Sequence, residues 1–192
     1  PPDLGRVLGL DRAPEVKTVR RKLKRLTAGP SEALLEALAQ RRVAARDEAM
    51  GFLYVDGHVR VYSGKHRLPK AHVARMRLSL PAAQEMWVND AVGDPIFFVT
   101  KEAHPQLVSA LPPILEQVRE LVGDRRVTVV FDRGGWSPRL FKEMQAGGFD
   151  VLTYRKGKYD VIPEDHFEEH DAPGRPGLRW LPCALGDPDL AE

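Results

Sequence analysis

Hydrophobic positions recur with a helical period over the first 45 residues. Over residues 15–27 the apolar side chains are three or four positions apart, which predicts one apolar side of an α-helix. These residues are Val16, Val19, Leu23 and Leu26. Gly29-Pro30 is expected to end this helix, and Ser31 to cap a second one that runs to about Ala45. The second helix is predicted to bury Leu34, Leu35, Leu38 and Val43.

From Met50 the chain changes to short apolar runs that are rich in β-formers. The run Gly51 to Asp56, followed by Gly57 and then by His58 to Tyr62, predicts a hairpin or a tight connection between two strands. A polar loop is expected over Ser63 to Lys70. Further strands are predicted over Ala74 to Leu80, Glu85 to Asn89 and Pro95 to Thr100, with a turn over Asn89 to Gly93. An antiparallel meander is the simplest way to join these pieces.

The second half alternates helices and strands. A long helix is predicted over about Gln106 to Val122, and its internal Pro112-Pro113 is expected to kink or restart it. A strand over Arg126 to Asp132, a helix from Ser137-Pro138 to Gln145 and a strand over Phe149 to Tyr154 follow. A meander that leads into parallel strands with crossover helices predicts an α/β fold with a mixed sheet.

The order of elements predicts three parts. Residues 1–47 form a short helical N-terminal lead-in and residues 48–160 form the core. Residues 161–192, in which Pro, Gly and acidic residues dominate, are expected to be an irregular acidic excursion. No internal repeat is found.

Composition narrows the class of protein. With 43% hydrophobic and 29% charged residues among 192, a soluble globular protein is expected. No apolar run approaches the roughly 18–20 residues that a membrane span needs. No signal peptide is found, and the single cysteine, Cys183, fits a reducing cytoplasm. The chain does not begin with Met, so we expect that it is part of a longer protein.

Charge is distributed unevenly, although the net charge is only +2. Residues 17–25 contain six basic side chains, namely Lys17, Arg20, Arg21, Lys22, Lys24 and Arg25. Residues 160–192 contain nine acidic side chains against Arg175 and Arg179. A basic front and an acidic tail favour an anionic partner near the N-terminus, although a solvated helix face explains the basic run equally well.

Two carboxylates end predicted strands. Asp56 follows Phe52 to Val55, and Asp132 follows Val127 to Phe131. An acid at the end of an apolar strand lies at the rim of the sheet, and two such acids on neighbouring strands converge. Converging carboxylates suit Mg²⁺ or Mn²⁺, which stabilises the charged oxygens of phosphoryl transfer. The alternatives are an ordinary Asp-Gly turn at Asp56 and a helix cap at Asp132.

Three stretches resemble the DDE class of insertion-sequence transposases. They are Tyr54 to Lys65 (YVDGHVRVYSGK), Val130 to Ser137 (VFDRGGWS) and Gly148 to Gly157 (GFDVLTYRKG). The resemblance covers about residues 45–160 and implies an RNase H-like fold. It also implies that Asp56 is the first catalytic, metal-binding acid and Asp132 the second. The implied reaction is DNA strand cleavage by water, followed by attack of the freed 3′-hydroxyl on target DNA. The family's third acid, a Glu on a later helix, has no match here, so its position stays unknown and catalysis by this chain alone is uncertain.

Several polar residues near these stretches are expected to contact DNA. They are Lys65, Arg67 and Lys70 in the loop after the first strands, Arg133 beside Asp132, and Tyr154, Arg155, Lys156 and Lys158 after the last strand. A solvated loop is the alternative for the first three. The expected partner is double-stranded DNA, both transposon ends and target, with a homodimer as one possible assembly and no membrane contact.

Two other functions remain open. An RNase H-like nuclease or resolvase would use Asp56 and Asp132 to hydrolyse DNA without strand transfer. A catalytically inactive DNA-binding or assembly module would retain the fold without the third acid, and removing either Asp would leave its DNA binding intact.

Overall fold

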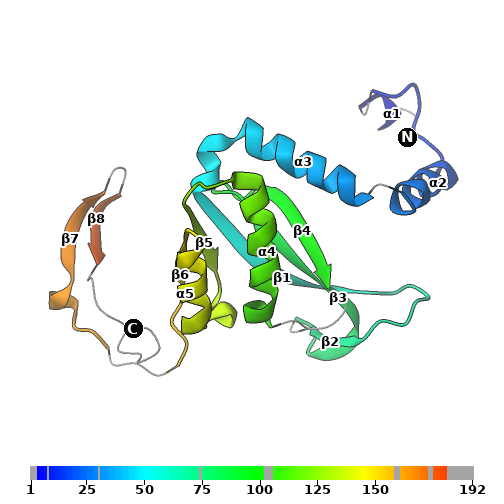
Figure 1. Ribbon diagram of the computed structural model, residues 1–192. Coiled ribbons are helices and arrows are strands. Elements are labelled where there is room, and N and C mark those ends of the chain that lie inside the picture. The colour runs from blue at the N-terminus through cyan, green and yellow to red at the C-terminus, as the bar shows by residue number, and fades with distance from the viewer. Residues whose placement is uncertain are drawn as a thin grey trace. The chain divides into compact units, whose positions relative to one another are not determined.

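The computed structural model describes residues 4–7, 9–29, 31–73, 75–101, 106–157, 161–172 and 175–180. The chain divides into two compact units, Pro1–Ala45 and Arg46–Glu192 (Figure 1). The first unit contains helices α1 (Leu4–Val7), α2 (Val16–Thr27) and α3 (Ser31–Ala45). The two helices predicted from the apolar spacing are therefore confirmed, with Ser31 as the first residue of α3.

The predicted buried stripe of α3 is largely wrong. Leu34, Leu35 and Leu38 are 41%, 39% and 52% exposed, and only Val43 of the predicted set is buried. The apolar row of α2 is also exposed. The reason is the size of the unit, because two helices and one short turn of a third offer too little surface to cover both apolar sides.

Six strands of the second unit form one mixed sheet in the order β2-β3-β1-β5-β6, with β4 also paired to β3. The strands are β1 (Phe52–Val61), β2 (Lys70–Val73), β3 (Leu78–Asn89), β4 (Pro95–Lys101), β5 (Val127–Phe131) and β6 (Phe149–Thr153). Strands β1, β5 and β6 are parallel, whereas β3 is antiparallel to β1, β2 and β4. An antiparallel group that leads into parallel strands confirms the predicted α/β, RNase H-like sheet.

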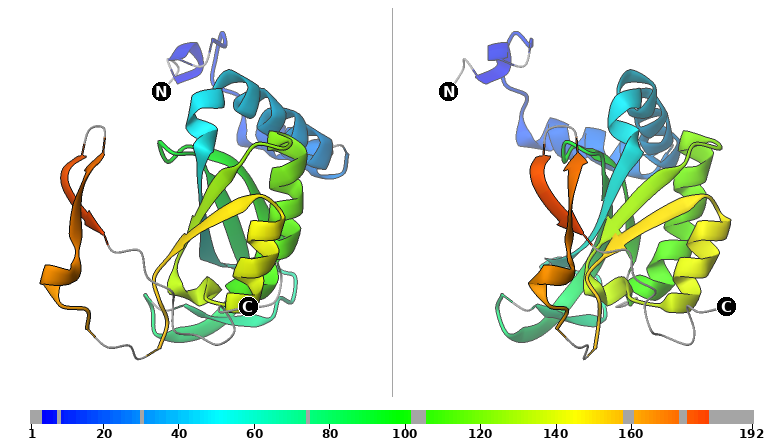
Figure 2. Two further views of the ribbon diagram at one scale, coloured as in Figure 1. Left: turned by 60° about the vertical axis from the view of Figure 1, so that its left-hand side comes forward. Right: turned by 90° about the vertical axis from the view of Figure 1, so that its left-hand side faces the viewer.

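One face of this sheet is covered by α4 (Leu107–Val122) and α5 (Pro138–Ala146), as two views show (Figures 1 and 2). Ser137 caps α5 as predicted, because its side chain accepts a hydrogen bond from the Leu140 amide. The buried core between helices and sheet includes Leu53, Val55, Met86, Val129, Leu111, Ile114 and Met144. Residues alternate between the two faces along each strand, so the intervening residues point to the opposite face, which we call the front face.

Strand β1 is continuous where the sequence predicted a hairpin. It pairs with β3 from Tyr54 to Val61 without a break. Gly57 lies inside it, opposite Met86, and a Cβ atom there would come within about 3.0 to 3.1 Å of the Gln84 and Met86 side chains. The glycine therefore permits close packing rather than a turn.

Three other boundaries differ from the prediction. The two strands predicted over 74–80 and 85–89 are one long strand, β3, and β2 begins earlier, at Lys70. Helix α4 continues through Pro112 and Pro113 and does not restart. Both prolines lie on its exposed side, so their rings do not disturb the buried apolar row.

The acidic C-terminal segment contains regular structure that its composition did not predict. A short 3-10 helix (Glu164–His166) precedes strands β7 (Glu168–Ala172) and β8 (Arg175–Trp180), which pair antiparallel. Among the described residues, no helix combines the length and the apolar character needed to cross a membrane.

A fully buried aspartate closes the predicted turn between β3 and β4. The Asp90 side chain is 0% exposed, and its Oδ1 accepts hydrogen bonds from the amides of Val92 (3.1 Å) and Asp94 (2.9 Å). Arg46 donates to its other oxygen at 3.4 Å and also pairs with Asp94. The turn therefore depends on one carboxylate.

We predict that Asp90→Ala lowers the free energy of unfolding by about 1–3 kcal/mol, because two amides lose their acceptor inside the protein. Chemical denaturation measures this change. Asp124→Ala, at an exposed aspartate in the turn after α4, is the control and should change stability by less than about 0.5 kcal/mol. Equal stability of the two variants would contradict a structural role of Asp90.

Candidate functional site

The two predicted catalytic acids occupy equivalent positions on neighbouring parallel strands. Val55 of β1 pairs with Phe131 of β5, and Phe131 pairs with Thr153 of β6. Asp56, Asp132 and Tyr154 each follow by one residue, so they form one row across the sheet. Adjacent strands lie roughly 4.8 Å apart. The two aspartates, which we call the acid pair, are thus neighbours on the front face, as the sequence predicted.

Each member of the acid pair is exposed and accepts one hydrogen bond from a nearby backbone amide. The Gly57 amide donates to Asp56 Oδ1 at 2.8 Å, and the Gly134 amide donates to Asp132 Oδ1 at 2.9 Å. The bond at Asp132 also caps a 3-10 turn (Arg133–Gly135), so the cap considered from the sequence is present. One amide per carboxylate leaves the second oxygen of each, Oδ2, available for a ligand.

The front face carries two further carboxylates, and arginine side chains neutralise both. Glu85 lies opposite His58, two residues along the strand from Asp56, and it is only 8% exposed. It forms an ion pair with Arg60, whose Nε lies 2.9 Å from Oε1, and its Oε2 accepts hydrogen bonds from Arg60 Nη2 at 3.1 Å and from Trp87 Nε1 at 3.2 Å. The sequence did not indicate this cluster, because only the pairing of β1 with β3 places Arg60 beside Glu85.

Asp150, at the other end of the front face, is the second neutralised carboxylate. Arg126 donates from Nε at 2.7 Å and from Nη2 at 2.6 Å, one bond to each oxygen. These hydrogen bonds, together with the positive charge, lower the pKa of Asp150 below its ordinary value. In contrast, no described lysine or arginine forms an ion pair with Asp56 or Asp132. Glu85 and Asp150 are therefore held by ion pairs within the fold, whereas Asp56 and Asp132 remain available to bind a ligand.

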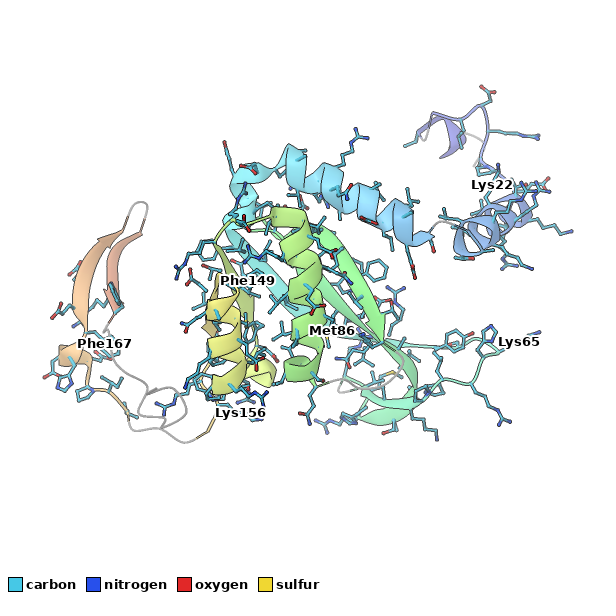
Figure 3. The ribbon with its side chains drawn as sticks, viewed as in Figure 1. Lys22, Lys65, Met86, Phe149, Lys156 and Phe167 are labelled. Atoms are coloured by element: carbon cyan, nitrogen blue, oxygen red, sulfur yellow. The ribbon has the colours of Figure 1, made fainter. Side chains whose placement is uncertain are left out.

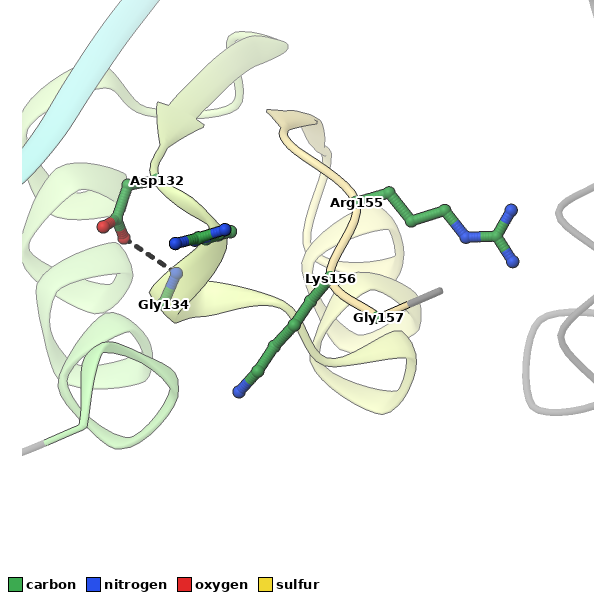
Figure 4. Close-up of a pocket in the computed structure, with 6 residues that line it drawn as sticks. Asp132, Gly134, Arg155, Lys156 and Gly157 are labelled. Atoms are coloured by element: carbon green, nitrogen blue, oxygen red, sulfur yellow. Dashed lines mark hydrogen bonds between the residues drawn. The ribbon is translucent and has the colours of Figure 1, made fainter. Parts of the chain in front are cut away.

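A hollow of about 530 Å³ lies beside Asp132 (Figure 4). Its lining consists of Asp132, Arg133, Gly134, Arg155, Lys156 and Gly157. Lys156 extends toward the side on which Asp132 and Gly134 lie, whereas Arg155 points away from Asp132. Arg133 and Lys156 beside Asp132 suit an anionic ligand held close to the acid pair.

The structure separates the predicted DNA-contacting residues into two groups. Arg133, Tyr154, Arg155 and Lys156 lie at the rim with Asp132, as expected. Lys65, Arg67 and Lys70 lie elsewhere, because β1 continues for five residues beyond Asp56 before their loop begins. Lys158 lies outside the described residues. Trp136 packs edge-on against Phe141 of α5, at 5.2 Å between ring centroids.

The acid pair has the chemistry of part of a metal site. Carboxylate oxygens are the ligands that Mg²⁺ and Mn²⁺ prefer, and each aspartate has an oxygen that no donor among the described residues uses. In the described part of the chain, no group of three or more His, Cys, Asp or Glu side chains is arranged to hold a metal ion. The residues present therefore fit two ligands of such a site, and the position of the third acid stays unassigned.

A comparison with protein families gives one match. A sequence profile of a family described as "Transposase protein" matches residues 2–174. No curated protein matches the chain. Solved structures that are similar include a piggyBac transposase synaptic complex with hairpin DNA (14% identity, TM-score 0.44), a Mos1 transposase paired-end complex with the left transposon end (12%, 0.37), and a Mos1 mariner paired-end complex with Mn (9%, 0.38).

The three similarities are partial. They cover 66%, 62% and 62% of this chain but only 27%, 39% and 41% of the respective transposase chains. The chain thus spans less than half the length of these proteins.

We predict that Asp150→Asn lowers stability at pH 7 and that this difference from the wild type disappears in acid. The folded protein lowers the pKa of Asp150. The ionised carboxylate therefore stabilises the fold fully at any pH above its pKa in the unfolded chain, which is about 3.9. This stabilisation is lost as the pH falls through the lower pKa that Asp150 has in the folded protein. Melting temperatures between pH 7 and pH 2.5 measure the difference. Asp124→Asn should show no such trend, and a difference that grows in acid would contradict the assignment.

Proposed function

The chain belongs to this family of transposase proteins, and we propose that its second unit is the front part of a catalytic core that cleaves and joins DNA. The observation that carries the proposal is the acid pair. Asp56 and Asp132 occupy one row on adjacent strands, and within the described part of the chain neither has an arginine partner, unlike Glu85 and Asp150. Burying or neutralising a carboxylate suits a structural role, whereas two adjacent unpaired carboxylates repel each other unless a cation is present.

Asp56 and Asp132 would hold Mg²⁺ or Mn²⁺ through their Oδ2 atoms. When bound, the metal would stabilise negative charge on the attacking and leaving oxygens of a phosphoryl transfer. The backbone amides of Gly57 and Gly134 fix the orientation of the two carboxylates, so less freedom is lost when a ligand binds. The exposure of both acids leaves room for a DNA strand above the sheet.

The basic hollow beside Asp132 would bind the DNA backbone next to the reacting phosphate. Arg133 and Lys156 supply positive charge there, and Arg155 and Tyr154 lie on the same rim. Arginine and lysine contacts to phosphate position a nucleic acid without reading its sequence. The rim would thus orient the strand while the acid pair supports the reaction.

Strand cleavage followed by transfer to target DNA is proposed for the longer protein that supplies a third acid. A specific observation favours a second candidate for the chain alone: in its described part, no third side chain joins the acid pair. A DNA-binding or assembly module without catalytic activity would have the same rim and the same fold. Metal binding separates the two functions.

We predict that the chain binds Mn²⁺ in isothermal calorimetry and that Asp56→Asn and Asp132→Asn each weaken this binding at least tenfold. Each variant loses an anionic ligand, and the lost free energy would be on the order of 1.4 kcal/mol or more. Asp124→Asn is the matched control and should bind as the wild type does. If neither aspartate variant changes Mn²⁺ binding, the metal-site proposal is wrong and the module is favoured.

We also predict that Arg133→Gln combined with Lys156→Gln reduces the salt dependence of binding to duplex DNA. Two lost phosphate contacts should lower the slope of log K against log[salt] by about 1.8. Fluorescence anisotropy between 50 and 200 mM KCl, roughly the range over which such contacts weaken, measures the slope. Arg139→Gln with Lys142→Gln, on helix α5 behind the sheet, is the control. An equal change in the control would indicate a general charge effect.

A further inference from the structure

A second basic surface, which we call the basic arm, comprises residues 57–84. It contains the last part of β1, the loop to β2, strand β2, the turn to β3 and the first half of β3. In 28 residues it has no Asp or Glu and six Lys or Arg, namely Arg60, Lys65, Arg67, Lys70, Arg75 and Arg77. In a chain with nearly equal numbers of acids and bases, such a segment concentrates positive charge on one structure.

The charge of the basic arm is directed to solvent. All six side chains are exposed, and Arg60 alone among them has an ion-pair partner, Glu85, in the described residues. The other five basic side chains are not neutralised from within the arm, because the arm contains no Asp or Glu. A cluster of uncompensated cations repels itself and is stabilised by an anionic partner.

The basic arm projects well beyond the acid pair. Trp87 lies opposite Asp56, and β3 extends back from there by nine residues to Leu78, where the turn with Arg75 and Arg77 begins. At about 3.3 Å per residue this distance is roughly 30 Å. Figure 3 shows Lys65 at the outer end of the loop between β1 and β2, away from the buried Met86. The arm thus presents cations at two tips, the loop and the turn.

The arm is held in shape by its own packing. Ala71 and Val73 of β2 are buried, so the basic residues between and beside them face outward. In the loop the Tyr62 ring stacks with His66 at 6.4 Å between centroids, and its hydroxyl accepts from the His66 amide. The ring also lies directly against Gly64, where a Cβ atom would overlap it. An ordered loop loses less entropy on binding than a flexible one does.

We propose that the basic arm binds the phosphate backbone of double-stranded DNA at a distance from the acid pair. The proposal rests on the proposed function in that the same duplex would continue from the cleavage site along the arm. A span of roughly 30 Å corresponds to about nine base pairs at 3.4 Å each. The arm adds Arg75 and Arg77, which the sequence analysis did not select, to Lys65, Arg67 and Lys70.

Duplex DNA fits the arm better than single-stranded nucleic acid does. Sites for single strands combine basic residues with aromatic side chains on which bases stack. The only Phe, Trp or Tyr in the arm is Tyr62, and it is half-buried against His66 and Gly64. Basic side chains that have no aromatic side chains beside them can contact the phosphates on the outside of a duplex but offer no surface for stacking unpaired bases.

The test measures binding of the chain to a fluorescein-labelled duplex of about 30 base pairs in EDTA, over a series of KCl concentrations. One variant combines Lys65→Gln, Arg67→Gln and Lys70→Gln, and another combines Arg75→Gln and Arg77→Asn. Asn suits position 77 because the Arg77 φ angle is 53°. The slope of log K against log[KCl] should fall by up to about 2.7 for the first variant and about 1.8 for the second.

Three comparisons decide the outcome. The control pair Arg139→Gln and Lys142→Gln should leave the slope near its wild-type value, and circular dichroism should show all variants folded. Unchanged slopes for the arm variants would overturn the proposal. So would a larger loss of affinity for a single strand of equal length, because it would indicate a different ligand.

The failure of this inference is distinguishable from the failure of the proposed function. Binding in EDTA does not depend on a metal ion, and the arm variants retain both aspartates. If Mn²⁺ binding is absent while the arm variants weaken DNA binding, the acid-pair proposal fails and the arm proposal stands. If Mn²⁺ binds normally and the arm variants bind DNA as the wild type does, the arm proposal fails alone.

Discussion

Strand β1 is hydrogen-bonded along both edges, antiparallel to β3 and parallel to β5, and this double pairing determines the arrangement of the whole site. Because side chains alternate along a strand, burying Leu53 and Val55 against the helices forces Asp56 onto the front face. Pairing with β5 then sets Asp132 beside it, and pairing with β3 sets Glu85 and Trp87 nearby. A shift of one residue in register would bury Asp56 instead.

The same strand connects two chemically different regions. At its middle it presents the acid pair, and its continuation through Gly57 supports the basic arm. A glycine at this position leaves room for the Met86 and Gln84 side chains, and β1 pairs with β3 up to Val61. The acid pair and the basic arm are thus joined by one continuous element.

Ion pairing completes the distinction among the front-face acids. Glu85 and Asp150 are carboxylates like Asp56 and Asp132, yet each forms an ion pair with one arginine. A buried carboxylate without such a partner would be costly, whereas an exposed one at the sheet rim is not. Asp56 and Asp132 therefore differ from Glu85 and Asp150 in their partners and their solvent exposure.

Local sequence determined much of this protein. Helical spacing in α2, the Ser137-Pro138 start of α5 and the apolar run of β5 depend on near neighbours, and these elements were predicted within a few residues. The acid pair was also accessible from sequence, because an acid that directly follows an apolar strand lies at a sheet rim. Tertiary structure alone decided the rest: Gly57 within a strand rather than a turn, the exposure of Leu34, Leu35 and Leu38, the Arg60–Glu85 pair and the separation of Lys65 from the rim. Each of these depends on which residue lies opposite across a strand or against a surface, and such contacts between distant residues leave no periodic signal in the chain.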